Sequence, residues 1–325
     1  MDADTAARAL WYAGRNRAEV RPCPLPPWTP GDVLVRTLWS GISRGTERLV
    51  FEGRVPASEA STMRAPMQDG AFPFPVKYGY STVGHVEDGP ADLRGRTVFA
   101  LHPHQDRFIA PATSVVPVPD GVPPRRATLA ANMETALNAL WDAEPPAGGR
   151  IVVVGAGIVG LLVSFLATGV PGATVTIVDV VPERRPIAEA LGAAFALPDA
   201  VPGNADVVFH TSATPAGLST AIAATGFEAR IIEMSWYGDG TIPVSLGGAF
   251  HSRRLQLISS QVGHVAPSHR AEWTHRRRLE KALSLLGDDR LDALITEEVA
   301  FADLPTHLPR ILAPEAPGLA TAVRY

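Results

Sequence analysis

The stretch Val152–Gly160, VVVGAGIVG, constrains the fold of this chain more than any other feature. Its glycines match the pattern G-x-G-x-x-G, with an apolar β-branched run before them and a helical pattern after them. The first glycine permits a tight turn, the second lets a pyrophosphate approach the backbone, and the third lets the helix pack on the strand. The stretch therefore predicts a dinucleotide-binding turn, whose predicted cofactor contacts are Gly155, Gly157, Ile158, Val159 and Gly160.

Asp179 ends a second apolar strand, TVTIVD, 19 positions after Gly160. An acidic residue at this place accepts hydrogen bonds from the adenosine ribose and repels a 2'-phosphate. The sequence therefore favours NAD over NADP. Arg184, in the following segment PERR, is a further predicted cofactor contact, and its charge leaves NADP open as the alternative.

Strand-like and helix-like segments alternate from Arg150 to Gln261, which predicts an α/β domain with a doubly wound parallel sheet. Ligands of such sheets lie outside the carboxyl ends of the strands. The uncharged run 151–170 has the length of a membrane-spanning helix, but its glycines and the strand that follows favour a strand, turn and helix. The predicted cofactor contacts at the strand ends are Thr211, Ser212, Ser235 and Trp236.

The first third of the chain, up to about Pro119, consists of short strand-like runs separated by glycine and proline. Helical patterns and a last strand follow Gln261. The sequence of 325 residues is long for one core, so we expect two domains. The predicted division is 1–119 with 262–325, and 120–261.

Composition excludes several classes of function. A formal net charge of -4 gives no field that would attract nucleic acid. The single cysteine, Cys23, rules out an internal disulfide and a cysteine-based structural zinc site. The N-terminal segment has acidic residues and no apolar stretch of a secretion signal, which predicts a cytoplasmic protein without a membrane span.

A β-rich start, a G-x-G-x-x-G domain and the C-terminal segment LDALITEEVAFADLPTHLPRIL together resemble the medium-chain dehydrogenase/reductase superfamily. The resemblance covers nearly the full chain. It implies a GroES-like β-rich catalytic domain made from both ends of the chain, an inserted Rossmann domain, and an active site in the cleft between them. It also implies a homodimer formed through the coenzyme domain.

The chain departs from zinc-dependent members of this superfamily at the positions of their ligands. Their Cys-Gly-Thr-Asp turn corresponds to Ser43-Arg44-Gly45-Thr46-Glu47, and their Gly-His-Glu segment to Gly79-Tyr80-Ser81. The four-cysteine lobe is also missing. The turn SGISRGTE and the segment YGYSTVG are similar to the bacteriochlorophyllide hydroxyethyl dehydrogenase branch, and the resemblance implies a protein without zinc.

Hydride transfer to or from a secondary alcohol requires an acid/base group and donors that polarise the oxygen. His104 is the predicted acid/base, with Asp106 to orient it, although the segment HPHQD also fits a surface loop. Tyr80 is either an oxyanion donor or a filler of the volume left by a metal ligand. Ser43 and Thr46 are further candidate catalytic hydroxyls.

Glu134 is a candidate catalytic carboxylate, or else the salt-bridge partner of Arg44. Arg44 itself is a predicted contact for an anionic substrate or the cofactor phosphates. Two histidines together with Glu134 could also form a different metal site.

The predicted function is therefore a zinc-independent NAD(P)-dependent oxidoreductase that interconverts a secondary alcohol and a ketone of a small metabolite. The alternatives are a quinone or enoyl double-bond reductase, and a nucleotide-binding redox-sensing protein without catalysis.

Overall fold

The computed structural model describes residues 7–325, which form two compact units. The first unit contains the chain up to Ala131, Leu283–Gly287 and Ile295–Tyr325, and the second contains Asn132–Ala282 and Asp288–Leu294. The cytoplasmic prediction was based on the N-terminal segment, and residues 1–6 of that segment lie outside the described residues. None of the helices between Ala7 and Tyr325 has both the length and the apolar character needed to cross a bilayer.

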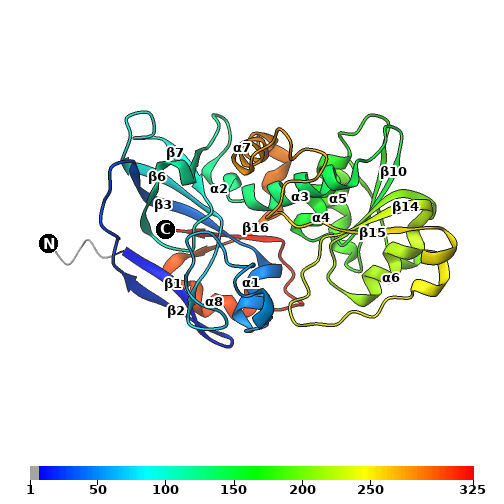
Figure 1. Cartoon of the computed structure of the whole chain (residues 1–325), viewed down its shortest axis with the longest axis horizontal. Coiled ribbons are helices and arrows are strands. Elements are labelled where there is room, and N and C mark those ends of the chain that lie inside the picture. The colour runs from blue at the N-terminus through cyan, green and yellow to red at the C-terminus, as the bar shows by residue number, and fades with distance from the viewer. Residues whose placement is uncertain (1–6) are drawn as a thin grey trace. The chain divides into compact units, whose positions relative to one another are not determined.

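The first unit is rich in β-structure, and its larger sheet joins strands from the first third of the chain to the C-terminal strands (Figure 1). This sheet has the strand order β16-β17-β3-β6-β7-β9, with β8 paired to β3, and a smaller sheet has the order β2-β1-β5-β4. The elements of this unit are β1 (Ala7–Gly14), β2 (Arg17–Cys23), β3 (Asp32–Ile42), α1 (Arg44–Phe51), β4 (Asp69–Gly70), β5 (Val76–Lys77), β6 (Thr82–Asp88), β7 (Thr97–Ala100), β8 (Arg107–Pro111), β9 (Val115–Pro117), α2 (Pro124–Ala127), β16 (Ile295–Ala300), α8 (Leu304–Ile311) and β17 (Ala320–Arg324).

The second unit is a parallel six-stranded sheet with helices around it (Figure 1). Its strand order, β12-β11-β10-β13-β14-β15, reverses direction between β10 and β13, as in a dinucleotide-binding fold. Its elements are β10 (Arg150–Val154), α4 (Ile158–Ala167), β11 (Thr174–Val178), α5 (Arg185–Ala190), β12 (Ala194–Ala196), β13 (Ala205–His210), α6 (Pro215–Ala224), β14 (Thr225–Glu233) and β15 (Gln256–Ser259), while most of α3 (Ala130–Ala143) and of α7 (His275–Leu285) also belongs to it.

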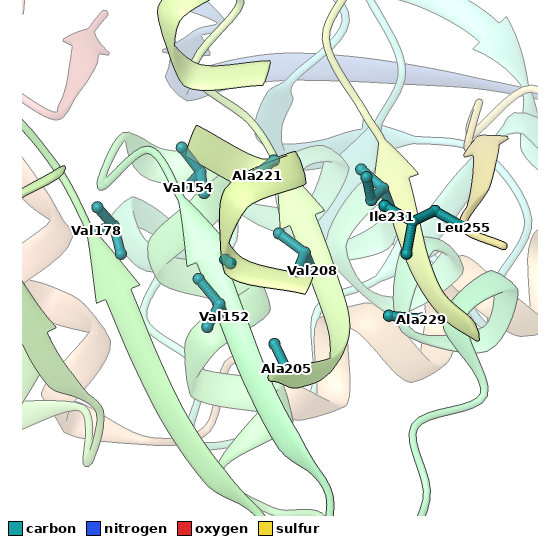
Figure 2. Close-up of a cluster of buried hydrophobic side chains, with 10 residues drawn as sticks. Val152, Val154, Val178, Ala205, Val208, Ala221, Ala229, Ile231 and Leu255 are labelled. Atoms are coloured by element: carbon teal, nitrogen blue, oxygen red, sulfur yellow. The ribbon is translucent and has the colours of Figure 1, made fainter. Parts of the chain in front are cut away.

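Figure 2 shows the core of the second unit on the α6 side of this sheet. Val152 and Val154 of β10, Val208 of β13 and Ile231 of β14 pack beneath Ala221 of α6, all of them buried. Burying each of the larger side chains contributes about 1.5–3 kcal/mol. This core holds the carboxyl ends of the strands in register.

The predicted α/β class is confirmed, and so is the strand, turn and helix over the apolar run, which forms β10 and α4. The compact units divide the chain at residues other than the predicted boundaries after 119 and 261. Arg278 of α7 explains why the residues after 261 stay with the second unit, because its guanidinium donates to Glu134 (3.0 Å) and Asn138 (2.5 Å) of α3. This buried contact joins α7 to the second unit.

Candidate active site

The segment Ser40–Glu47, which reads as a polar turn, is the end of β3 followed by the first turn of α1. Ser43 precedes the helix, and its backbone N–H donates to Oε1 of Glu47 at 2.7 Å. The Glu47 side chain thus folds back to satisfy a backbone donor that the helix leaves unpaired. The Ser43 hydroxyl is left to bind another side chain.

Glu47 is the centre of a buried hydrogen-bond network in the first unit. Its side chain is 0% exposed, and Oε2 accepts from the Tyr12 hydroxyl at 2.6 Å and from Nε2 of His104 at 3.0 Å. Buried charge is tolerated in proteins only with such partners. Burial, and after it the charge of Glu47, raises the pKa of Tyr12 well above its usual value, so this phenol stays a donor.

His104 continues the network on its other side. Because a carboxylate carries no hydrogen, Nε2 is the donor to Glu47, and in the neutral ring Nδ1 accepts from the Ser40 hydroxyl at 2.7 Å. Ser40 in turn contacts the Tyr325 hydroxyl at 3.0 Å. A Cβ atom on Gly79 would lie 2.8 Å from the His104 ring, so His104 packs directly on that backbone.

The prediction that Asp106 orients His104 is wrong. Gln105 forms an isolated antiparallel β-bridge with Ala9, which fixes this segment along β1. The Asp106 carboxylate accepts hydrogen bonds from the backbone N–H and the side chain of Arg8, at 2.7 and 3.0 Å. The surface-loop alternative is also wrong, since His104 is 1% exposed. Sequence proximity thus located the histidine but not its partner.

Tyr80, Ser43 and Thr46 form a cluster of hydroxyls beside this network. The Tyr80 phenol donates to Oγ of Ser43 at 2.5 Å and also forms a hydrogen bond with the Thr46 hydroxyl. Burial raises the pKa of Tyr80 to about 12, against the lowering effect of these two partners. Tyr80 and Thr46 are only half-buried, so the structure brings three predicted catalytic residues together with a protonated phenol among them.

Arg44 and Glu134 have other partners than those predicted. The guanidinium of Arg44 donates to the carbonyl groups of Ala313, Ala316 and Gly318, and so braces the segment before β17. Glu134, in the second unit, accepts from Arg278. The Arg44–Glu134 salt bridge is therefore a wrong prediction.

The glycine turn of the second unit has the expected geometry. Gly155 has φ +111°, a conformation that favours glycine, and a Cβ atom on Gly160 would meet the Gly155 carbonyl at 1.9 Å. Asp179 accepts from the backbone N–H groups of Ala156 (2.5 Å) and Val181 (2.9 Å). Asp179 therefore holds the turn itself, a role that the sequence did not predict.

The other predicted cofactor contacts lie around this edge of the sheet. Gly157 precedes α4, and Ile158 and Val159 begin it, where a helix offers backbone N–H groups to an anion. Thr211 donates to the carbonyls of Gly155 (2.9 Å) and Val154 (3.1 Å).

Ser235 and Trp236 follow β14, and both are half-buried. The Ser235 hydroxyl accepts from the backbone N–H of Ala213 at 3.1 Å. Arg184 is half-buried near Asp179; burial lowers the pKa of its guanidinium, while the charges of Asp179 and Glu183 oppose that shift.

Comparison with known proteins places this geometry among dehydrogenases. No protein-family model matches the chain. A zinc-type alcohol dehydrogenase-like protein of Haemophilus influenzae, itself uncharacterized, is 25% identical over 344 residues, covering 93% of this chain and 94% of that protein. This likeness supports the predicted enzyme class.

Solved dehydrogenases share the fold over nearly the full chain. L-idonate 5-dehydrogenase of Escherichia coli superposes with a TM-score of 0.80 at 16% identity, covering 99% of each chain. 2R,3R-butanediol dehydrogenase of Bacillus subtilis gives 0.77 at 18% identity, covering 98% of this chain and 100% of the other. A protein of Sinorhizobium meliloti assigned as a zinc-binding dehydrogenase, bound to NADP, gives 0.78 at 18% identity, covering 99% and 100%.

The prediction of NAD as cofactor with no zinc is wrong on these findings. The Haemophilus relative is named as a zinc-type protein, and the Sinorhizobium protein is described as zinc-binding and is bound to NADP.

The donor groups of the chain nevertheless do not fit a zinc ion. Ser43 and Tyr80 offer hydroxyls bonded to each other, and residues 7–325 contain no group of three or more His, Cys, Asp or Glu side chains that could hold a metal. The predicted alternative metal site is not formed within that range either: Nδ1 of His102 donates to the Pro103 carbonyl, and His104 is bound as described above. We therefore derive no catalytic step through a metal.

Proposed function

We propose that this protein is an NAD(P)-dependent oxidoreductase that interconverts a secondary alcohol and a ketone of a small molecule by hydride transfer. The observation that carries the proposal is the glycine turn at the point where the order of the parallel sheet reverses. The name of the Haemophilus relative supports an alcohol as the substrate class.

The second unit would hold the dinucleotide. Its nicotinamide, when bound, accepts hydride from an alcohol or supplies it to a ketone. The turn Gly155–Gly160 and the first N–H groups of α4 are suited to the pyrophosphate. Thr211, Ser212 and Ser235 provide hydroxyls at the ends of neighbouring strands, where a ribose and a carboxamide need polar partners.

The first unit would supply the proton donor. A pKa of about 12 keeps the Tyr80 phenol protonated at neutral pH. When substrate binds, its single hydrogen would turn from Oγ of Ser43 to the carbonyl oxygen of the substrate. Ser43 and Thr46 hold that phenol in place. In ketone reduction the phenolic proton moves to the developing alkoxide and solvent returns a proton to the phenolate. In alcohol oxidation the phenol first gives its proton to solvent, and the phenolate then takes the hydroxyl proton of the substrate.

His104 acts in this proposal as a positioning residue. At 1% exposure it does not reach a substrate, but its bond to Glu47 fixes the carboxylate that caps α1. That cap sets the position of Ser43, and hence of the Tyr80 hydroxyl. In this proposal the acid/base group is therefore the Tyr80 phenol and not His104.

Titration of the protein with NADH and NADPH, followed by nucleotide fluorescence, tests the first half of the proposal. We expect saturable binding of at least one of them. Absorbance at the nicotinamide band then tests turnover with secondary alcohols, their ketones and a matched enone. Turnover of the enone alone would point to a double-bond reductase, and binding without any turnover to a sensor. If neither nucleotide binds, the proposal is wrong.

We also propose a homodimer formed through the second unit. β15 is an edge strand of the parallel sheet, and Leu257 on it is 41% exposed. An edge strand with an exposed apolar side chain is a template for pairing with another copy. Sedimentation velocity at micromolar concentration should give a dimer that Leu257→Lys weakens, and a wild-type monomer would contradict this.

A further inference from the structure

The second unit contains a buried histidine–carboxylate pair that the proposed chemistry does not use. His210 ends β13 and Glu233 ends β14, and the two residues are partners in the register of these parallel strands. Nδ1 of His210 lies 2.7 Å from Oε2 of Glu233, and Nε2 lies 2.8 Å from the hydroxyl of Ser212. His210 is 0% exposed, whereas Ser212 is half-buried.

Glu233 determines which nitrogen of His210 carries the hydrogen. Oε1 accepts from the backbone N–H of Ser235 at 2.8 Å, and Oε2 accepts from the Tyr237 hydroxyl at 3.1 Å as well as from His210. Burial alone would raise the pKa of Glu233, but the hydrogen bonds from His210 and Ser235 outweigh it and lower the pKa. The ionised carboxylate requires a donor at Nδ1, which in the neutral tautomer leaves Nε2 as an acceptor.

Ser212 must then donate its only hydrogen to His210. Thr214 lies on the other side of the Ser212 hydroxyl at 3.1 Å; it accepts from the Gly217 backbone N–H, so its own hydrogen is available to Ser212. A Cβ atom on Gly217 would lie 1.9 Å from Oγ of Ser212. The helix backbone therefore closes one side of the hydroxyl, which can offer a ligand only a lone pair.

This lone pair lies at the edge where a dinucleotide binds in this type of sheet. The order of strands reverses between β10 and β13, and the half of the sheet formed by β13, β14 and β15 accommodates the second mononucleotide, opposite the half that carries Asp179. Thr211, next to Ser212, is already bonded to the carbonyl of Gly155 in the glycine turn.

We propose that Glu233 and His210 set the Ser212 hydroxyl as a hydrogen-bond acceptor for a donor group of the nicotinamide nucleotide. This inference rests on the proposed function and adds the residues that orient the nicotinamide half. The donor is an N–H of the carboxamide or a ribose hydroxyl, both of which an acceptor-only serine can bind.

The same three residues also resemble a nucleophile, base and orienting acid, but the surroundings disfavour acyl transfer. Such a serine needs backbone donors for the oxyanion, commonly including the N–H of the next residue. Here that N–H, of Ala213, is donated to Ser235. The arrangement therefore serves binding rather than attack.

Calorimetric binding to the wild type, Ser212→Ala and Glu233→Gln tests the inference. The ligands are the intact dinucleotide, its 3-acetylpyridine analogue, in which a methyl group replaces the carboxamide nitrogen, and ADP-ribose. We expect both substitutions to weaken binding of the intact dinucleotide by about tenfold, which corresponds to the loss of one hydrogen bond. ADP-ribose, which lacks the nicotinamide but keeps its ribose, should bind all three proteins equally if the donor is the carboxamide.

The analogue distinguishes the two donors. A carboxamide contact predicts that the wild type prefers the intact dinucleotide to the analogue and that Ser212→Ala loses this preference. A ribose contact predicts that Ser212→Ala weakens binding of the intact dinucleotide, the analogue and ADP-ribose to the same extent. If Ser212→Ala and Glu233→Gln bind the intact dinucleotide as tightly as the wild type, the inference is wrong while the proposed function stands. A wild type that binds neither dinucleotide nor ADP-ribose overturns both.

Discussion

Replacing Tyr80 by phenylalanine is expected to lower kcat by about a hundred- to ten-thousand-fold, the range that a positioned proton donor contributes. The reason is that the phenol, protonated up to a pKa of about 12, is the half-buried donor of the hydroxyl cluster. The phenol donates a single hydrogen bond, to Ser43 at 2.5 Å, so stability should fall by only about 1 kcal/mol. Steady-state kinetics with the best alcohol and urea unfolding measure the two effects.

Tyr78→Phe is the matched control for this substitution. Tyr78 is two residues earlier and 2% exposed, and its ring meets that of Tyr80 edge-on at 6.0 Å. Removing its hydroxyl takes nothing from Ser43 or Thr46, so kcat should change less than about threefold if the cluster carries the chemistry. A Tyr80→Phe protein that retains wild-type kcat, or a Tyr78→Phe protein that loses as much, would remove Tyr80 from the mechanism.

The sequence predicts the coenzyme-binding part of the fold well because its signals are local. The turn from Gly155 to Gly160, the strand before it and the helix after it are consecutive in the chain, and backbone conformation there depends on the glycines themselves. Asp179 was located by its distance from that turn. The hydrogen bond that Asp179 accepts from the backbone of Ala156 was not predicted, because the ends of β10 and β11 meet only in the folded sheet.

The hydroxyl cluster was predicted in part because Ser43, Thr46 and Tyr80 stand at positions known from a related pattern. The network behind it was missed because its members are distant in sequence. Ser40 and Tyr325 are 285 positions apart in the sequence. Tyr12 of β1 is hydrogen-bonded to Glu47 of α1. The one available signal was the spacing of Glu47, which lies three and four positions before Val50 and Phe51 and so shares their helix face, where a buried carboxylate needs donors.

Removal of the Glu47 carboxylate is expected to have the largest effect on stability. In Glu47→Ala the Tyr12 hydroxyl, the His104 ring and the Ser43 backbone N–H all lose their acceptor, and all three residues are buried. Each buried donor left without an acceptor costs about 1–3 kcal/mol, so the loss of all three should cost at least about 3 kcal/mol. For a protein of this size we therefore expect Tm to fall by roughly 10 °C, measured by circular dichroism together with the urea midpoint.

Two further variants separate the loss of these hydrogen bonds from the loss of a charge. Glu47→Gln keeps the shape and one acceptor oxygen but turns an amide N–H₂ toward a donor, so its stability should lie between those of wild type and Glu47→Ala. Glu59→Ala removes an exposed carboxylate from the same unit and should stay within about 0.5 kcal/mol of the wild type. If Glu47→Ala is destabilised no more than Glu59→Ala, the buried network does not stabilise the first unit. The ordered placement of Ser43 and Tyr80 would then need another cause, because the cap on α1 is the contact through which Glu47 fixes them.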